Sequence, residues 1–153
     1  RMPTIRSALD CFADRRIGPI IHAGDIVSPF AARVLADWGG VLHVIYGNND
    51  GEKAGLAQVL PPIVQGPLRL RLDGRTVVVG HHFDWLRPED LAGADVVIAG
   101  HTHGIVNEIR DGKLYLNPGE CCGWLTHRST VAILDTAGLS AEIVDLPIPS
   151  ASA

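Results

Sequence analysis

The sequence has 153 residues, 13 Lys and Arg against 17 Asp and Glu, and a formal net charge of −4. This is the length of one domain with a single core. The cationic residues are scattered, so we expect no nucleic-acid surface. No apolar run approaches the roughly 20 residues of a membrane helix. The three cysteines lack C-x-x-C spacing, so reduced thiols and a cytoplasmic protein are expected.

Helix and strand patterns alternate along the chain, which indicates an α/β fold. Helices are predicted over residues 3–16, from the candidate cap Ser28 to Trp38, and from Pro88. Two hairpins are predicted, one with strands 68–72 and 76–79 and one with strands 105–109 and 114–116. The other predicted strands are 20–23, 41–46, 95–99, 130–134 and 141–144. We expect a single domain over 1–146 and a C-terminal tail over 147–153.

Four predicted strands end in the same way, with a glycine followed by a polar side chain that can bind a metal. These strand ends are Gly24-Asp25, Gly47-Asn48, Gly80-His81-His82 and Gly100-His101-Thr102-His103. Taken singly, each is explained by an ordinary turn or by surface histidines. Ligand sites of α/β folds lie beyond the strand ends, and mixed oxygen and nitrogen ligands suit Mn, Fe, Ni or Zn. Together the four strand ends predict one metal site.

In this order the segments GD, GNND, GH and GHTH resemble the calcineurin-like metallophosphoesterases. The resemblance is greatest to the small bacterial and archaeal phosphodiesterases that are related to the retromer subunit of vacuolar sorting. The later segment NPGECCGW resembles the NPG loop of that subfamily. The resemblance implies a two-sheet sandwich flanked by helices, with two divalent ions at the strand ends. Mn²⁺ is the expected ion, and Ni²⁺, Fe²⁺ and Zn²⁺ are alternatives.

The resemblance also assigns roles to single residues. Asp25 would bridge both ions, Asn48 and His101 would hold the second ion, and His103 would hold the first. His81 or His82 would complete the second position, and this choice is open, because one register places Val79 there and a surface histidine pair is a further alternative. Asp50 would fix the loop or a bound water by hydrogen bonding.

Two consequences follow from the absence of the family's opening Asp-x-His motif. That motif would supply two ligands of the first ion and a central strand. We expect that the sequence given omits this first strand, the alternative being a protein that begins at Arg1. The second ion is therefore expected to bind more readily than the first, because more of its ligands are present.

The function implied by the resemblance is hydrolysis of a small phosphoester, a diester rather than a monoester. A hydroxide that bridges the two ions would attack phosphorus in line with the leaving oxygen. Asn49 stands where other branches have an acid histidine, and an amide has no proton to give, so His82 is the nearest candidate donor. Diesters with acidic leaving groups should suffer least from this change.

Two alternatives belong to other functional classes. One is a protein-interaction scaffold of the same fold, which the missing motif and the altered stretch at Gly80-His81 favour. The other is a simple metal-binding or storage domain, which would leave the Gly-Asn-Asn-Asp loop unexplained. The sequence makes no prediction of oligomeric state.

Overall fold

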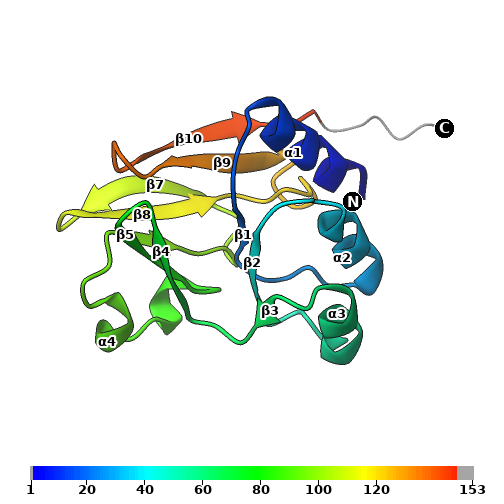
Figure 1. The fold of residues 1–153 in the computed structure, drawn as a ribbon, viewed down its shortest axis with the longest axis horizontal. Coiled ribbons are helices and arrows are strands. Elements are labelled where there is room, and N and C mark those ends of the chain that lie inside the picture. Colours follow the sequence, from blue (N-terminus) through cyan, green and yellow to red (C-terminus); the bar gives the residue numbers. More distant parts are fainter. Residues whose placement is uncertain (1, 148–153) are drawn as a thin grey trace.

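The structure is a computed structural model that describes residues 2–147, and strands and helices alternate through it as expected (Figure 1). Residues 148–153 of the predicted tail lie outside the described part. In chain order the elements are α1 (Met2–Asp14), β1 (Ile20–His22), α2 (Pro29–Ala36), β2 (Leu42–Ile45), α3 (Lys53–Val59), β3 (Ile63–Val64), β4 (Leu68–Leu72), β5 (Arg75–Val79), the 3-10 helix η1 (Phe83–Trp85), α4 (Pro88–Leu91), β6 (Val96–Ile98), β7 (Ile105–Arg110), β8 (Lys113–Pro118), β9 (Thr130–Asp135) and β10 (Ser140–Asp145).

The strands of the described residues form three sheets. The five-stranded sheet has the order β4-β5-β6-β8-β7, with β5, β6 and β8 parallel and the outer strands antiparallel to their neighbours. The three-stranded sheet β1-β2-β3 is parallel, and β9 and β10 form an antiparallel pair. The carboxyl ends of β1 and β2 therefore lie at one edge of their sheet, and those of β5 and β6 at one edge of theirs.

One core joins the three sheets. Ile45 of β2 packs in the same cluster as side chains of β5, β6 and β8, and side chains of β9 and β10 pack against that cluster. The β1-β2-β3 sheet and the β9-β10 pair thus form one divided layer that faces the five-stranded sheet. This confirms the predicted α/β sandwich and adds that one of its layers is split. We expected a first strand to be missing, and β1 stands at the edge of its sheet among the described residues, so that expectation stays a prediction.

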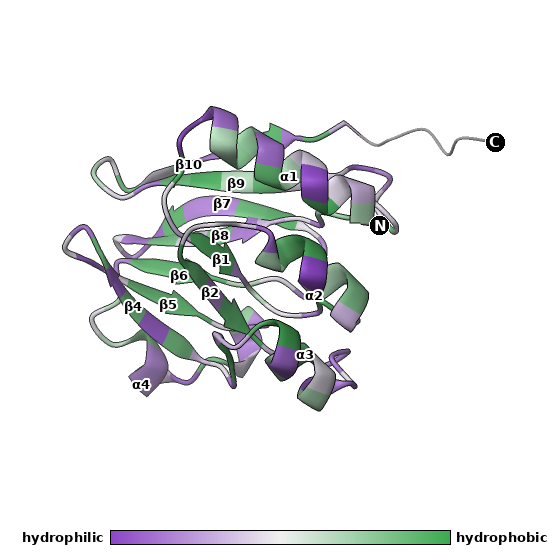
Figure 2. Cartoon of the chain, turned by 45° about the vertical axis from the view of Figure 1, so that its right-hand side comes forward, coloured by the Kyte–Doolittle hydropathy of each residue, from purple (hydrophilic) through white to green (hydrophobic). Residues whose placement is uncertain are grey.

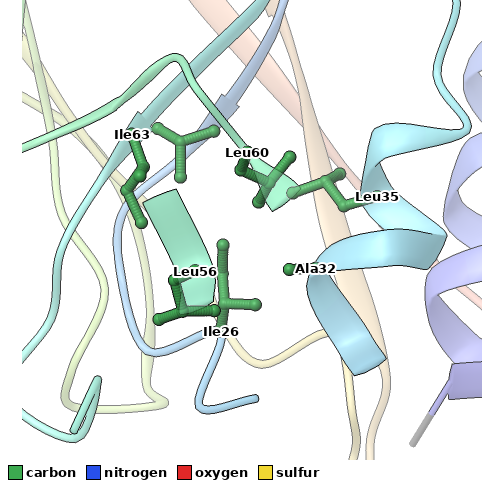
Figure 3. Packing of buried hydrophobic residues seen from close by; sticks show 7 residues of the cluster. Ile26, Ala32, Leu35, Leu56, Leu60 and Ile63 are labelled. Carbon is green, nitrogen blue, oxygen red and sulfur yellow. The ribbon is translucent and has the colours of Figure 1, made fainter. Parts of the chain in front are cut away.

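Helices cover the outer faces of the sandwich. Figure 3 shows side chains of α2, α3 and the neighbouring strands pointing toward one another, and α1 packs beside them through Ile5 and Leu9. Apolar and polar residues alternate along α1, whereas β6 and the last three residues of β5 are hydrophobic (Figure 2). The outer face of β5 and β6 is covered by η1 and α4, where Val78 and Val97 pack against Phe83 and Leu86. Burial on both faces explains why these strands do not alternate in hydropathy.

Several predicted boundaries differ from the structure. The first helix ends at Asp14, and Arg16 takes a positive φ of 53° that a helix does not allow. Ser28 caps α2 as predicted, but the helix ends at Ala36 and not at Trp38. The second strand of the second hairpin continues through Pro118, two residues beyond its predicted end at residue 116. The other predicted strands are each confirmed to within about two residues.

The sequence reasoning missed α3, β3 and η1. Gly55 interrupts α3, and the helix is capped by Glu52, which is not a preferred N-cap residue. The strand β3 has only two residues and η1 only three, so neither shows a period. Among the described residues, no helix is both long and apolar enough to cross a membrane.

Candidate metal centre

The ligand-bearing loops follow β1, β2, β5 and β6, and their backbone is unusual. Asp25, Val27, His101 and His103 all have φ between 59° and 73°, in the left-handed region. Such a conformation costs of order 1–3 kcal/mol for a residue other than glycine, and it persists where the surroundings impose it. Four of the nine positive-φ residues other than glycine in the described part of the chain therefore lie in the loops after β1 and β6, and three of these four are candidate ligands.

Close approach of the loops after β1 and β2 requires glycine. Gly24 has a φ of 98°, and a Cβ there would lie 2.7 Å from Gly47 Cα and 2.7 Å from His81 Nδ1. A Cβ on Gly47 would overlap the carboxylate of Asp25. The two glycines thus let the loops that carry Asp25 and Asn48 lie against each other and against His81.

Four of the predicted ligands converge. One ligand atom each from Asp25, His81 and His101 lies within 4.8 Å of the other two. Asn48 Oδ1 is 2.8 Å from His81 Nε2 and 2.9 Å from His101 Nδ1. His81 Nε2 is also 3.3 Å from Asp25 Oδ2. Side chains from four separate strand ends therefore meet at one point.

The chemistry of this cluster fits a cation. His81 Nδ1–H donates to the carbonyl of Ala23 at 2.6 Å, so a neutral ring presents an unprotonated Nε2 to the oxygens of Asn48 and Asp25. Electron pairs that face one another repel, and a shared cation relieves this repulsion. Burial and the nearby rings of His81 and His82 lower the pKa of His101, which favours the neutral imidazole that binds metals.

The structure separates His81 from His82. His81 is 7% exposed and points at the cluster, whereas His82 Nδ1 accepts the Asp84 backbone N–H at 3.0 Å and caps η1. The His82 ring remains 4.9 Å from the ring of His101, beside the cluster. Val79 lies in the core between the sheets, so the register that placed it at the ligand position is wrong.

Asp50 and Asn49 hold the two loops together. Asp50 is 2% exposed and accepts the backbone N–H groups of Gly47, Asp25 and Val27 at 2.7 to 3.0 Å. This is the loop-fixing geometry expected of Asp50. Asn49 donates from its backbone and its side chain to the two carboxylate oxygens of Asp25, both at 2.8 Å. Asn49 thus orients Asp25, a contact that the sequence reasoning missed.

His103 lies outside the group formed by Asp25, His81 and His101, and its Nδ1 is 2.7 Å from Glu120 Oε2. Glu120 also accepts the N–H groups of Leu125 and Thr126, both at 2.7 Å. Burial alone would raise the pKa of Glu120, but these hydrogen bonds together lower it to about 2. The ionised carboxylate fixes the His103 ring through Nδ1, so Nε2 is the ring atom that could bind a metal.

Three residues that support the site were not predicted. Besides Glu120, these are Asn117, which is fully buried and donates to the Gly100 carbonyl at 2.8 Å, and His22, whose Nδ1 accepts the Gly24 N–H. Burial lowers the pKa of His22 and keeps it neutral. The available signal for Glu120 and Asn117 was the segment NPGECCGW, which contains both residues, Asn117 at the end of β8 and Glu120 in the loop that follows it.

Comparison with known proteins decides the family. The sequence profile of the calcineurin-like phosphoesterase superfamily domain matches residues 1–138. The chain belongs to this superfamily. A curated phosphodiesterase of Methanocaldococcus jannaschii is 38% identical over 143 residues, which span 88% of this chain and 86% of that protein.

Solved structures of calcineurin-like phosphoesterases and related proteins share the fold. An archaeal phosphodiesterase is 34% identical, with a TM-score of 0.83 over 94% of this chain and 92% of the other. A phosphoesterase of E. coli is 20% identical, with a TM-score of 0.72 over 95% and 93% of the two chains. Vps29 of Entamoeba histolytica is 19% identical, with a TM-score of 0.65 over 92% and 88%.

The predicted family and fold are therefore confirmed, and a phosphoesterase function is supported. Calcineurin-like phosphoesterases use divalent metals, and the cluster of Asp25, His81 and His101 is a possible metal-binding group. The individual roles of the site residues stay predictions.

Proposed function

We propose that this calcineurin-like phosphoesterase is a metal-dependent phosphodiesterase that hydrolyses small phosphoesters with two divalent ions. The observation that carries the proposal is the arrangement of Asn48 Oδ1 and Asp25 Oδ2 around His81 Nε2, at 2.8 and 3.3 Å. Acceptors that face one another in this way are suited to a shared cation. The 38% identical phosphodiesterase supports the same assignment.

The described residues supply the two metal positions unequally. Asp25, Asn48, His81 and His101 would hold the second ion, whereas Asp25 and His103, with Glu120 behind it, would hold the first. Affinity rises with the number and geometry of ligands, so the second position should fill at lower metal concentration. Nitrogen and oxygen ligands without thiolates suit Mn²⁺, and Ni²⁺, Fe²⁺ and Zn²⁺ are alternatives.

The bound ions would supply the positive charge that activates the attacking water and neutralises the phosphoryl oxygens. The protein's own residues would position that charge and stabilise the oxygen of the leaving group. Because His82 Nδ1 accepts an N–H, its Nε2 carries the proton of the neutral ring. The His82 Nε2–H would donate a hydrogen bond to the leaving oxygen and so stabilise its developing negative charge, without transferring the proton, because a neutral imidazole is a very weak acid. Asn49 would hold Asp25 in place.

A diester assay with Mn²⁺ tests the proposal. Asp25→Ala should abolish metal-dependent hydrolysis of bis(para-nitrophenyl) phosphate, because it removes the charge shared by both ions. Asn49→Ala should cost much less, since it keeps the backbone N–H to Asp25 and removes only one side-chain hydrogen bond. Asp10→Ala, an exposed position on α1, is the matched control and should match the wild type. Equal activity of Asp25→Ala and the wild type would refute the proposal.

A further inference from the structure

Trp85 is an exposed aromatic side chain beside the candidate metal centre. It is 55% exposed, yet its ring centroid lies 4.9 Å from that of His101, 5.3 Å from that of His82 and 5.7 Å from that of His81. None of the buried hydrophobic clusters of the described residues includes it. Its ring contacts are therefore made with the imidazoles of the site, and packing in a core does not explain its position.

The backbone holds Trp85 in place. It is the last residue of η1, which His82 caps through the Asp84 N–H, and the Trp85 N–H itself is bonded to the His82 carbonyl at 3.3 Å. On either side of it, Leu86 packs against Gly80, and Phe83 makes an edge-to-face contact with Tyr115 with centroids 5.6 Å apart. An indole fixed in this way loses little conformational entropy when a ligand stacks on it.

We propose that Trp85 is a stacking platform for an aromatic ring on the phosphoester, so that the preferred substrates are phosphodiesters with an aryl group or a nucleobase on one ester arm. The proposal rests on the function proposed above, because it needs phosphorus to bind between Asp25, His81 and His101. A substituent on phosphorus that extends past His101 and His82 would contact the indole of Trp85. Aromatic rings stack on Trp whatever their substituents, so the platform selects a flat ring and not a particular base.

The absence of a histidine at position 49 points the same way. Asn49 has no proton to give to the leaving oxygen, so leaving groups of low pKa react best. Phenolic leaving groups have a lower pKa than alcohols. An aryl ester therefore suits both features of the site. Its ring can stack on Trp85, and its leaving group of low pKa needs little help from an acid, which Asn49 cannot give.

Binding of inert phosphonates to the Mn²⁺-loaded protein separates the platform from the chemistry. Phenylphosphonate should bind wild type more tightly than methylphosphonate in a calorimetric titration. Trp85→Ala should weaken the binding of phenylphosphonate by about five- to a hundredfold, the range for base stacking. The affinity for methylphosphonate should stay unchanged. Trp85→Phe should restore most of the difference. Ile109→Ala, which removes an exposed apolar side chain near the β7–β8 turn, should change neither.

Thymidine monophosphate in the same titration distinguishes the two sources of the ring. Loss of its affinity in Trp85→Ala assigns the platform to nucleobases, and loss of phenylphosphonate affinity alone assigns it to aryl esters. If Trp85→Ala weakens phenylphosphonate and methylphosphonate equally, or weakens neither, the platform is refuted. A wild type that binds phosphonates selectively but hydrolyses no diester would refute the proposed function and leave the platform standing.

Discussion

Asp25 is the residue on which most of the site's contacts converge. Its backbone N–H is held by Asp50, its two oxygens accept from Asn49, and one of these oxygens lies 3.3 Å from His81. Its φ of 61° is imposed by these contacts and by the neighbouring Gly24. The carboxylate is thus fixed before any ion binds, which is how preorganised ligands are built.

Glu120 is the second residue whose contacts predict a measurable effect. Its carboxylate accepts hydrogen bonds from the backbone N–H groups of Leu125 and Thr126 and is hydrogen-bonded to His103 Nδ1. The side chain is 4% exposed. Glu120→Gln replaces one acceptor by a donor that faces His103. We expect the free energy of unfolding of the metal-free protein to fall by about 2 kcal/mol, the scale of a hydrogen bond to a buried charge. Urea denaturation measures this change.

Glu142→Gln is the control for Glu120→Gln, because Glu142 pairs with Arg15 and its side chain is 58% exposed. Its effect should stay within about 0.5 kcal/mol, as for other surface substitutions. If the two variants unfold at the same urea concentration, Glu120 does not organise the loop.

The raised pKa of the Cys121 thiol predicts that this residue reacts slowly with alkylating reagents. Burial and the neighbouring Cys122 raise the pKa of Cys121 to about 11, although its thiol is hydrogen-bonded to the Thr4 carbonyl. A raised pKa keeps the thiol protonated at pH 8, and only the thiolate reacts with iodoacetamide. Peptide mass spectrometry should therefore find Cys121 alkylated slowly in the folded protein and rapidly in urea. Equal rates in the two states would contradict this account.

At the scale of elements, the site depends on how closely the loop after β1 approaches the loop after β2. Asp50 binds both loops through three backbone N–H groups, and Gly24 and Gly47 leave the space in which they meet. The β1-β2-β3 sheet and the five-stranded sheet then bring Asp25 and Asn48 to His81 and His101. Neither sheet alone contains the cluster.

Gly47→Ala tests this close approach. The added Cβ would overlap the Asp25 carboxylate and backbone, so the loops must move apart. We expect a loss of about 1–3 kcal/mol in the free energy of unfolding, as for other overpacked sites, together with weaker Mn²⁺ binding. Thermal denaturation and calorimetry measure the two effects. Gly51→Ala is the matched control, since a Cβ there meets nothing within 4 Å, and a similar loss in both variants would contradict the role of Gly47.

The same elements show which parts of the structure can be predicted from sequence. The strand ends are predictable because an apolar run that stops at glycine marks both a buried strand and its loop, as at Gly47 and Gly100. The short helix α3 is not, because Gly55 breaks its pattern and tertiary packing of Leu56 stabilises it instead. The choice between His81 and His82 depends on a hydrogen bond to Ala23, a contact 58 residues away in sequence that no local pattern encodes.

At the scale of the whole molecule, a divided sandwich brings four distant segments to one edge. The core that joins the sheets is apolar, and the polar side chains of the strand ends lie just beyond it. We expect residues 1–146 to behave as a single domain, because the cluster that contains Ile45 joins two of the sheets and side chains of the third pack against it. The candidate metal centre is then a property of the assembled fold and of no single segment.

An anomalous difference map of a crystal grown with Mn²⁺ tests the central claim most directly. The strongest peak should lie between Asp25, Asn48, His81 and His101, with coordinating oxygen and nitrogen atoms at about 2.0–2.3 Å, near the range of first-row divalent ions. A second, weaker peak should lie beside His103. A map with its strongest peak elsewhere, or with no peak between Asp25 and His101 at saturating Mn²⁺, would contradict the account.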